Sequence, residues 1–287
     1  MNVAAKYTKD RYVPGALVVA YALKKYKTRH DIILLHDNTL DPENYNILAR
    51  VFTKVIAINL ITDEETRPLH YSKQNQIYSP WIAHSYTKWN ALGLTEYEKI
   101  CFLDADNLPL ENIDILLDEV EAPAGCFRTV SLPDSIGVFN HFPDNLNAPV
   151  PNELIKKALS GAAVLGASLV VLPTGRLSLY RNYIISGQFR RESAKMRCIS
   201  GPDETSITMF MMNTGYTWHN IPLTFNTIPW KASTIEGVHM LTFTGQEKPW
   251  EMNPDKWPDL KIYYKLVKQL VKDYPDSARF FPHFHQN

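Results

Sequence analysis

Two aspartates, Asp104 and Asp106, stand two residues apart directly after the apolar segment KICFL at residues 99–103. Because side chains alternate along an extended chain, carboxylates at positions i and i+2 point to the same side. Carboxylate oxygens are the ligands that Mg²⁺ and Mn²⁺ prefer, and such an ion usually keeps positions open for phosphate oxygens. The spacing therefore indicates a divalent-metal site for a phosphate-bearing substrate, although Asp, Asn and Pro are also typical of a simple polar turn.

The same spacing occurs in aspartyl phosphatases, which place a nucleophilic aspartate and an acid aspartate two residues apart after an apolar strand. The motif of that family usually lies near the N-terminus and continues to Thr or Val two residues on. Here Leu108 stands at that place, and the motif lies a third of the way along the chain. A DxD aspartyl phosphatase is therefore the weaker alternative.

A second candidate segment is TFTGQEKPW at residues 242–250. Gly245 permits close approach of the backbone to a ligand, and Pro249 stiffens the turn that holds Lys248. A fixed ammonium beside a metal-bound diphosphate would stabilise negative charge on a leaving group. Taken alone, this segment is more simply explained as a surface loop with a solvated lysine.

The elements that would position these residues follow from the hydrophobic pattern, in which short apolar runs alternate with amphipathic segments. Such alternation is typical of an α/β fold with a mostly parallel sheet and helices on both faces. Ligands of such sheets bind beyond the carboxyl ends of the strands, where the two aspartates lie. The predicted strands cover residues 2–5, 31–36, 55–58, 99–103, 168–172 and 238–243. The predicted helices start at Pro14 or cover residues 41–51, 81–94, 112–120, 175–183, 203–212 and 258–273.

No internal repeat or linker interrupts this pattern, so we expect one domain over residues 1–287, with the C-terminal helix at residues 258–273 packing on it. Residues 132–151 are rich in Pro and Asn and predict a long loop, a candidate lid over a site.

The composition excludes several classes of protein. With 30 Lys+Arg, 30 Asp+Glu and 45% hydrophobic residues, the chain is neither disordered nor fibrous. Zero net charge argues against a nucleic-acid partner, because such binding needs surplus Lys and Arg. Three separated cysteines indicate neither a disulfide framework nor a zinc site. The N-terminus lacks a signal-peptide pattern, and the longest apolar stretch is shorter than the about 20 residues of a membrane helix, so we expect a cytoplasmic protein without a membrane span.

Several segments, in order along most of the chain, resemble those of glycosyltransferase family 8, the group that contains glycogenin and galactinol synthase. These segments are DRYVPGALVV at residues 10–19, YTKWNAL at 86–92, FLDAD at 102–106, GPDE at 201–204 and GQEKPW at 245–250. The resemblance implies a GT-A fold with a Rossmann-like sheet. It also implies transfer of glucose or galactose from a UDP-sugar to an acceptor hydroxyl, with retention of the anomeric configuration.

The resemblance further implies roles for individual residues. Asp104 and Asp106 would hold Mn²⁺, or Mg²⁺, against the diphosphate, and Lys88 and Asp203 would contact the donor sugar and take part in catalysis. For Asp203, two other interpretations stay open, a nucleophile or the N-cap of the following helix. The remaining residues implied for UDP-sugar binding are Thr8 and Tyr12 at the uracil, Ala105, Glu204 and Gly245, and Lys248 at the diphosphate.

Two positions depart from the family's pattern. Thr242 stands where the family has a metal-ligating histidine, and His239 could replace that ligand only if its strand shifted in register. Leu165 stands where the family has an asparagine that touches the donor sugar. These departures leave open a non-catalytic or weakened nucleotide-sugar-binding protein of the same fold.

The sequence says less about the acceptor of the sugar. Residues 226–239 contain no tyrosine where glycogenin presents its self-glucosylated one, so we do not expect priming of glycogen. The acceptor stays open among a sugar, a polyol and a protein. The choice between glucose and galactose and the oligomeric state, a homodimer included, stay open as well.

Overall fold

A computed structural model describes residues 10–62, 84–127, 144–160, 165–194, 196, 201–229, 234–245, 247–254 and 260–284. Their contacts divide the chain into two compact units. Unit 1 comprises the described residues of Met1–Ile58, Leu103–Asp114 and Thr224–Asn287, and unit 2 comprises those of Asn59–Phe102 and Ile115–Leu223. The expectation of a single domain stays a prediction.

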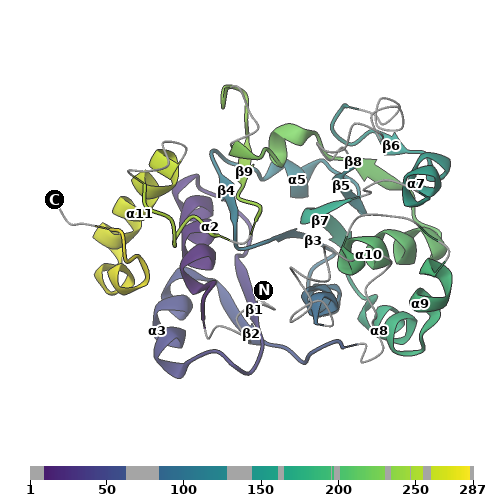
Figure 1. Cartoon of the computed structure of the whole chain (residues 1–287), viewed down its shortest axis with the longest axis horizontal. Coiled ribbons are helices and arrows are strands. Elements are labelled where there is room, and N and C mark those ends of the chain that lie inside the picture. Colours follow the sequence, from purple (N-terminus) through teal and green to yellow (C-terminus); the bar gives the residue numbers. More distant parts are fainter. Residues whose placement is uncertain are drawn as a thin grey trace. The chain divides into compact units, whose positions relative to one another are not determined.

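Unit 1 is built around helix α2 (Val13–Lys25), which packs against strand β4 (Asn107–Pro109) and helix α11 (Lys261–Asp273) (Figure 1). Pro14 lies in the first turn of α2, where a missing N–H breaks no helical hydrogen bond. The core of unit 1 gathers apolar side chains from all of these elements. Its fully buried members include Leu17, Val18, Ala20, Leu48, Val51, Leu108, Val267 and Leu270.

Two small sheets belong to unit 1. Strands β1 (Ile33–His36) and β2 (Lys54–Ala57) pair in parallel and are connected by helix α3 (Pro42–Val51). Strand β4 pairs antiparallel with β9 (Met240–Thr242). The pairing of β4 with β9 brings the segment after Asp106 next to the segment before Lys248, although they are far apart in the sequence.

Unit 2 contains a five-stranded sheet in the order β3-β7-β5-β8-β6. Strand β5 runs antiparallel to β7 and parallel to β8, so this sheet is mixed. The strands are β3 (Lys99–Leu103), whose last residue belongs to unit 1, β5 (Ala124–Cys126), β6 (Pro149–Val150), β7 (Gly166–Pro173) and β8 (Trp218–Asn220). The helices are η1 (Ser85–Gly93), α5 (Ile115–Asp118), α7 (Asn152–Leu159), α8 (Leu177–Ile185), α9 (Gln188–Ser193) and α10 (Pro202–Asn213).

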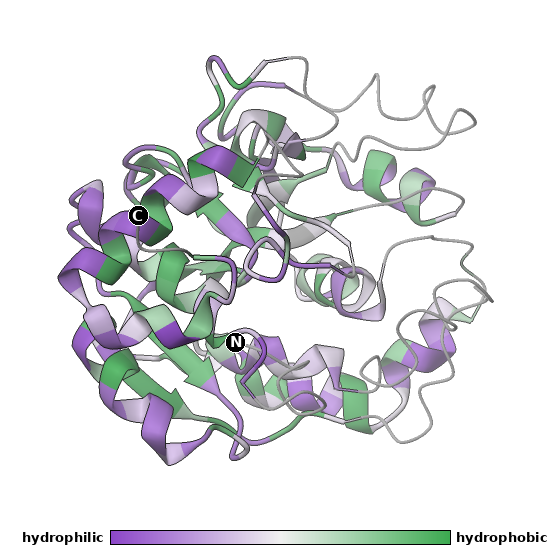
Figure 2. Cartoon of the chain, turned by 60° about the vertical axis from the view of Figure 1, so that its left-hand side comes forward, coloured by the Kyte–Doolittle hydropathy of each residue, from purple (hydrophilic) through white to green (hydrophobic). Residues whose placement is uncertain are grey.

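Hydropathy follows this packing within each unit. In α11, the side chains at positions 263, 266, 267 and 270 are buried, whereas Lys265, Lys268 and Lys272 are exposed. In Figure 2, single helices carry both hydrophobic residues (green) and hydrophilic residues (purple). In the described ranges, no helix has both the length and the hydrophobicity that crossing a bilayer requires.

The α/β class and most predicted elements are confirmed, and three predictions need correction. The predicted helix at residues 81–94 is a 3₁₀-helix, η1, within its described part. The predicted loop at 132–151 contains β6 near its end, and its residues up to 143 lie outside the described ranges, as does the predicted strand at 2–5.

The third correction concerns the predicted helix at residues 112–120, which is reduced to the single turn α5. Asn112 Oδ1 accepts a hydrogen bond from the backbone N of Asp114 at 2.8 Å, and the Asp114 carboxylate accepts one from the backbone N of Arg29 at 2.9 Å. Local side-chain bonds of this kind compete with helical hydrogen bonds, so the helix begins only after Asp114.

Candidate active site

The aspartate pair lies at residues 104–106, where β3 ends and β4 begins, and it is held from two sides within unit 1. A Cβ atom added to Gly15 would collide with the carbonyl oxygen of Ala105, so glycine lets helix α2 approach this segment closely. The carbonyl oxygen of Asp106 accepts a hydrogen bond from the backbone N of Phe243 at 3.0 Å. The DxD backbone is therefore fixed both by α2 and by the residue that follows β9.

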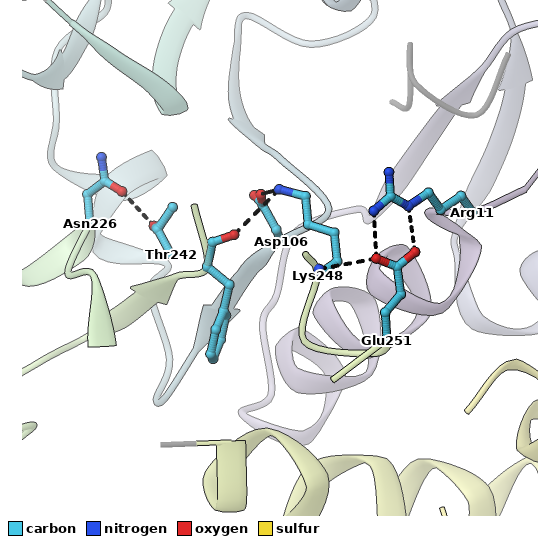
Figure 3. A network of polar contacts seen from close by, with 7 residues as sticks. Arg11, Asp106, Asn226, Thr242, Lys248 and Glu251 are labelled. Carbon is cyan, nitrogen blue, oxygen red and sulfur yellow. Dashed lines mark hydrogen bonds and ion pairs between the residues drawn. The ribbon is translucent and has the colours of Figure 1, made fainter. Parts of the chain in front are cut away.

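Lys248 forms an ion pair with Asp106, with 2.6 Å between Nζ and Oδ2 (Figure 3). The two side chains are only 8% and 13% exposed. Burial alone would lower the pKa of Lys248, but the Asp106 carboxylate, with smaller contributions from Tyr12 and Asp104, raises it above its ordinary value. Lys248 is therefore a charged ammonium at neutral pH, positioned against the second aspartate of the motif.

The segment before α2 reaches the same place. The Tyr12 ring meets the Trp250 ring edge-on at 5.5 Å between centroids, and the Lys248 ammonium lies 5.8 Å from the Tyr12 centroid. Burial raises the pKa of the Tyr12 phenol, although Lys248 and Arg11 act in the opposite direction. The phenol is therefore neutral at neutral pH and can serve as an uncharged contact for a ligand.

Arg11 and Glu251 form a two-bond clamp at the edge of this cluster (Figure 3). Arg11 Nε and Nη2 donate to Glu251 Oε1 and Oε2 at 2.5 and 2.6 Å. Glu251 Oε2 also accepts a hydrogen bond from the backbone N of Lys248 at 3.2 Å. The clamp therefore ties the segment that carries Tyr12 to the turn that carries Lys248, and it borders a cleft of about 440 Å³ that Trp250 also lines.

Thr242 stands at the position where a third metal ligand is expected, but its hydroxyl forms a hydrogen bond with another side chain. Its side chain is 1% exposed, and its hydroxyl donates to Asn226 Oδ1 at 2.5 Å, as Figure 3 shows. The pairing of Thr242 with Asn107 shows no shift of register, so His239 does not take its place. The His239 Nδ1 instead lies 2.5 Å from a carboxylate oxygen of Glu111.

The side chains present fit a divalent cation in part. Asp104 and Asp106 offer two carboxylates, which suit Mn²⁺ or Mg²⁺. Among the residues that the structure describes, no group of three or more His, Cys, Asp or Glu side chains is arranged to hold a metal ion. The other coordination positions would have to come from phosphate oxygens and water, which is common for ions held by one or two carboxylates.

Unit 2 holds the two predicted catalytic residues together. Lys88, in η1, and Asp203, in α10, form an ion pair at 2.9 Å with side chains 11% and 8% exposed. The Lys88 ammonium also lies over the Trp89 and Phe102 rings, at 5.3 and 5.5 Å from their centroids. The ion pair thus brings a buried charge of each sign together in unit 2.

The start of α10 excludes one interpretation of Asp203. Gly201 is the N-cap and Pro202 the first helical residue, so the assignment of Asp203 as N-cap is wrong. Glu204 supports this helix start, because its Oε2 accepts a hydrogen bond from the backbone N of Gly201 at 2.9 Å. The Asp203 carboxylate remains available for the ion pair with Lys88.

Three further positions singled out in the sequence are Gly245, Leu165 and Thr8. Gly245 has a φ of 118°, in the left-handed region that favours glycine. Leu165 is fully buried, and a Cβ atom added to Gly125 would collide with it, so Leu165 serves the core of unit 2. Thr8 lies outside the described residues.

Three partners in the site were not predicted from the sequence: Asn226, Arg11 and Glu251. Arg11 and Glu251 are separated by 240 positions, and no local pattern connects them. The only available signal was adjacency, because Arg11 precedes Tyr12 and Glu251 follows the KPW sequence.

The fold defines the class of protein. The galactosyltransferase LgtC, solved in complex with donor and acceptor sugar analogues, superposes with a TM-score of 0.56 at 13% identity, over 93% of this chain and 97% of that chain. At this identity the likeness shows the fold alone, and that fold is GT-A. The predicted fold class is confirmed.

The sequence model of glycosyl transferase family 8 matches residues 2–152, and the chain belongs to that family. An uncharacterized protein, R707 of Acanthamoeba polyphaga mimivirus, is 23% identical over 270 residues, which cover 88% of this chain and 84% of that protein. Human glycogenin-1 is 32% identical over 117 residues. That match covers 41% of this chain and only 32% of glycogenin-1, so the activity of the whole relative does not transfer with it.

Proposed function

We propose that this chain is a retaining glycosyltransferase that moves a hexose, glucose or galactose, from a UDP-sugar to an acceptor hydroxyl. The observation that carries the proposal is the buried pair of Lys248 and Asp106, with Asp104 beside it and Tyr12 within reach. A cation and a carboxylate held together at a strand end are the groups that a metal-bound diphosphate requires. Family membership supports the same assignment.

In this proposal, unit 1 binds the nucleotide. Asp104 and Asp106 would hold Mn²⁺, or Mg²⁺, which when bound would neutralise charge on the departing diphosphate. The Lys248 ammonium stabilises the same charge, and Tyr12 contacts the uracil together with Thr8. The backbone around Ala105 and at Gly245 approaches the ligand closely, because small side chains leave room there.

Unit 2 would bind the donor sugar in the same proposal. The Lys88 ammonium donates to a sugar hydroxyl, and the Asp203 carboxylate accepts from another. The acceptor hydroxyl approaches the anomeric carbon from the face that UDP leaves. Its oxygen bonds to that carbon as the bond from that carbon to the UDP oxygen breaks, and its proton passes to an oxygen of the departing diphosphate, so the anomeric configuration is retained. The acceptor is a sugar, a polyol or a protein, and the site residues alone do not distinguish these classes.

Release of UDP tests this function. UDP-glucose and UDP-galactose are each incubated with the wild type and with Asp106→Asn, with and without Mn²⁺. We expect metal-dependent release by the wild type and a loss of about 100-fold or more in the variant, the usual effect of removing a group that stabilises transition-state charge. Asp276→Asn, which changes an exposed carboxylate, is the control. Equal release by Asp106→Asn and the wild type would contradict the metal role.

One observation favours a second candidate, a nucleotide-sugar-binding protein that does not transfer the sugar. Thr242 gives its hydroxyl to Asn226 and offers no third ligand. A pure binder would take up UDP in calorimetry yet release none from either UDP-sugar. The same pair of measurements therefore separates the two candidates.

A further inference from the structure

We infer that Lys248 is the resident counter-ion of Asp106, and that a diphosphate has to draw its ammonium away before a divalent cation can use that carboxylate. The inference rests on the proposed function for the identity of the diphosphate. Its consequence is that nucleotide and divalent cation bind this chain as a coupled pair, each weakly without the other.

The Asp106 carboxylate already has a cation as its partner. The Lys248 Nζ lies 2.6 Å from Asp106 Oδ2, and the two side chains are 8% and 13% exposed. Two cations that share one buried carboxylate repel each other strongly, because little water is present to screen them. The ammonium and a divalent cation therefore compete for Asp106.

The described residues offer a divalent cation few other ligands at this place. Asp104 supplies one further carboxylate, while the Thr242 hydroxyl is directed to Asn226 at 2.5 Å. Within the described ranges, no third acidic, histidine or cysteine side chain completes a metal-binding group. Without a nucleotide, we therefore expect weak binding of Mn²⁺.

The Lys248 side chain can exchange partners without movement of its backbone. The backbone N of Lys248 donates to Glu251 Oε2 at 3.2 Å, and its carbonyl oxygen accepts from the backbone N of Glu251 at 2.8 Å. The turn is thereby held in place, while the ammonium sits on a flexible four-carbon chain. The Phe243 carbonyl oxygen also lies near the ammonium, at the long distance of 3.5 Å. A diphosphate can therefore take over the ammonium by rotation of this side chain alone.

When the diphosphate holds Lys248, Asp106 is released for the cation. Linkage makes the effect reciprocal, so UDP raises the affinity for Mn²⁺ by the same factor by which Mn²⁺ raises the affinity for UDP. Lys248 thus acts on the order of binding as well as on the charge of the diphosphate.

Binding of Mn²⁺, measured by the electron paramagnetic resonance signal of the free ion, tests the inference without any need for activity. The wild type is compared with Lys248→Met, with Lys248→Arg and with the control Lys99→Met. Lys99 is a suitable control because its ammonium donates to a neutral acceptor, the carbonyl oxygen of Val120, at 2.8 Å. Each protein is titrated with and without saturating UDP, against the same solutions lacking protein.

Without UDP, we expect Lys248→Met to bind Mn²⁺ about tenfold or more tightly than the wild type, while Lys248→Arg and Lys99→Met bind it as weakly as the wild type. With UDP, the wild type should gain about tenfold or more, and Lys248→Met should gain much less. If Lys248→Met and the wild type bind Mn²⁺ equally without UDP, or if UDP leaves the wild-type affinity unchanged although it binds, the inference is overturned.

Failure of the proposed function has a different signature. In that case UDP does not bind to any of the proteins, while the nucleotide-free comparison of Lys248→Met with the wild type still decides whether Lys248 competes for Asp106. If Lys248→Met does not fold, the two wild-type titrations with and without UDP remain decisive for the coupling.

Discussion

The Thr242 hydroxyl donates a 2.5 Å hydrogen bond to Oδ1 of Asn226, and this bond occupies the place where a third metal ligand is expected. Thr242 is fully enclosed at the end of β9, so the bond satisfies a hydroxyl that water does not reach. The threonine that departs from the family's pattern thus has a hydrogen-bond partner of its own.

Restoring a ligand at this position should strengthen metal binding. We expect Thr242→His combined with Asn226→Ala, which makes room for the larger ring, to raise the affinity for Mn²⁺ about tenfold, the order by which changes around a metal ligand act. Asn226→Ala alone is the control and should instead reduce stability by about 1–3 kcal/mol, because the buried hydroxyl loses its acceptor. An unchanged Mn²⁺ affinity in the double variant would refute this account of Thr242.

The clamp between Arg11 and Glu251 should affect nucleotide binding indirectly, because it holds the segments of Tyr12 and Lys248 in position. Glu251→Gln weakens a charged two-bond contact to Arg11 and the bond to the Lys248 backbone, so we expect UDP to bind about fivefold more weakly in calorimetry, equivalent to about 1 kcal/mol. The charge swap Arg11→Glu with Glu251→Arg should recover part of this loss. Glu153→Gln, at an exposed ion pair, should have no effect. Equal weakening by the swap and by Glu251→Gln would argue against the clamp.

Breaking the buried ion pair of Lys88 and Asp203 should strongly lower the free energy of unfolding. Asp203→Ala removes the buried carboxylate that lies 2.9 Å from the Lys88 ammonium, and we expect a loss of about 3–5 kcal/mol in the free energy of unfolding measured with urea. The double replacement Lys88→Met with Asp203→Leu should be far less destabilising, because it removes both charges. Glu153→Ala, at the exposed pair with Lys156, should change stability by less than about 1 kcal/mol. A loss from Asp203→Ala no larger than this control would contradict the burial of the pair.

Asp114 should make stability depend on pH. Burial alone would raise its pKa, but hydrogen bonds from Thr28, Arg29 and Asn112 outweigh burial and hold the pKa below its ordinary value. A carboxyl with a lowered pKa stabilises the folded state above the unfolded pKa of about 3.9, and this contribution is lost as the pH falls through the folded pKa.

We therefore expect Asp114→Asn to cost about 1.5–3 kcal/mol at pH 7, with the difference from the wild type shrinking as the pH falls below about 4. Urea unfolding at a series of pH values measures this difference. Asp276→Asn, at an exposed carboxylate, gives the baseline. A difference that stays constant down to pH 3 would contradict the assignment.

The sequence predicted the parts of the site that depend on local pattern. The apolar run before Asp104 predicted β3, and the i, i+2 spacing predicted two carboxylates at its end. Pro14 and Asp41 correctly predicted the starts of α2 and α3, since Asp41 accepts a hydrogen bond from the backbone N of Glu43 at 3.0 Å. Both signals act within a few residues, which is why they are visible in the sequence.

The contacts that join distant segments were beyond prediction. The ion pair of Lys248 with Asp106 spans 142 positions, and its bond to Asp106 replaces the solvated lysine that the sequence alone suggested. The helix expected at residues 112–120 failed for a related reason, because the carboxylate of Asp114 is used by Thr28 and Arg29 from another part of the chain. Tertiary partners of this kind override local propensity.

A crystal soaked with UDP and Mn²⁺, measured at a wavelength where manganese scatters anomalously, tests the central claim most directly. We predict an anomalous peak within coordination distance of Asp104 and Asp106, with the diphosphate on the same ion and the Lys248 ammonium moved from Asp106 to a phosphate oxygen. Electron density for UDP and manganese away from both aspartates, with Lys248 still 2.6 Å from Asp106, would contradict it.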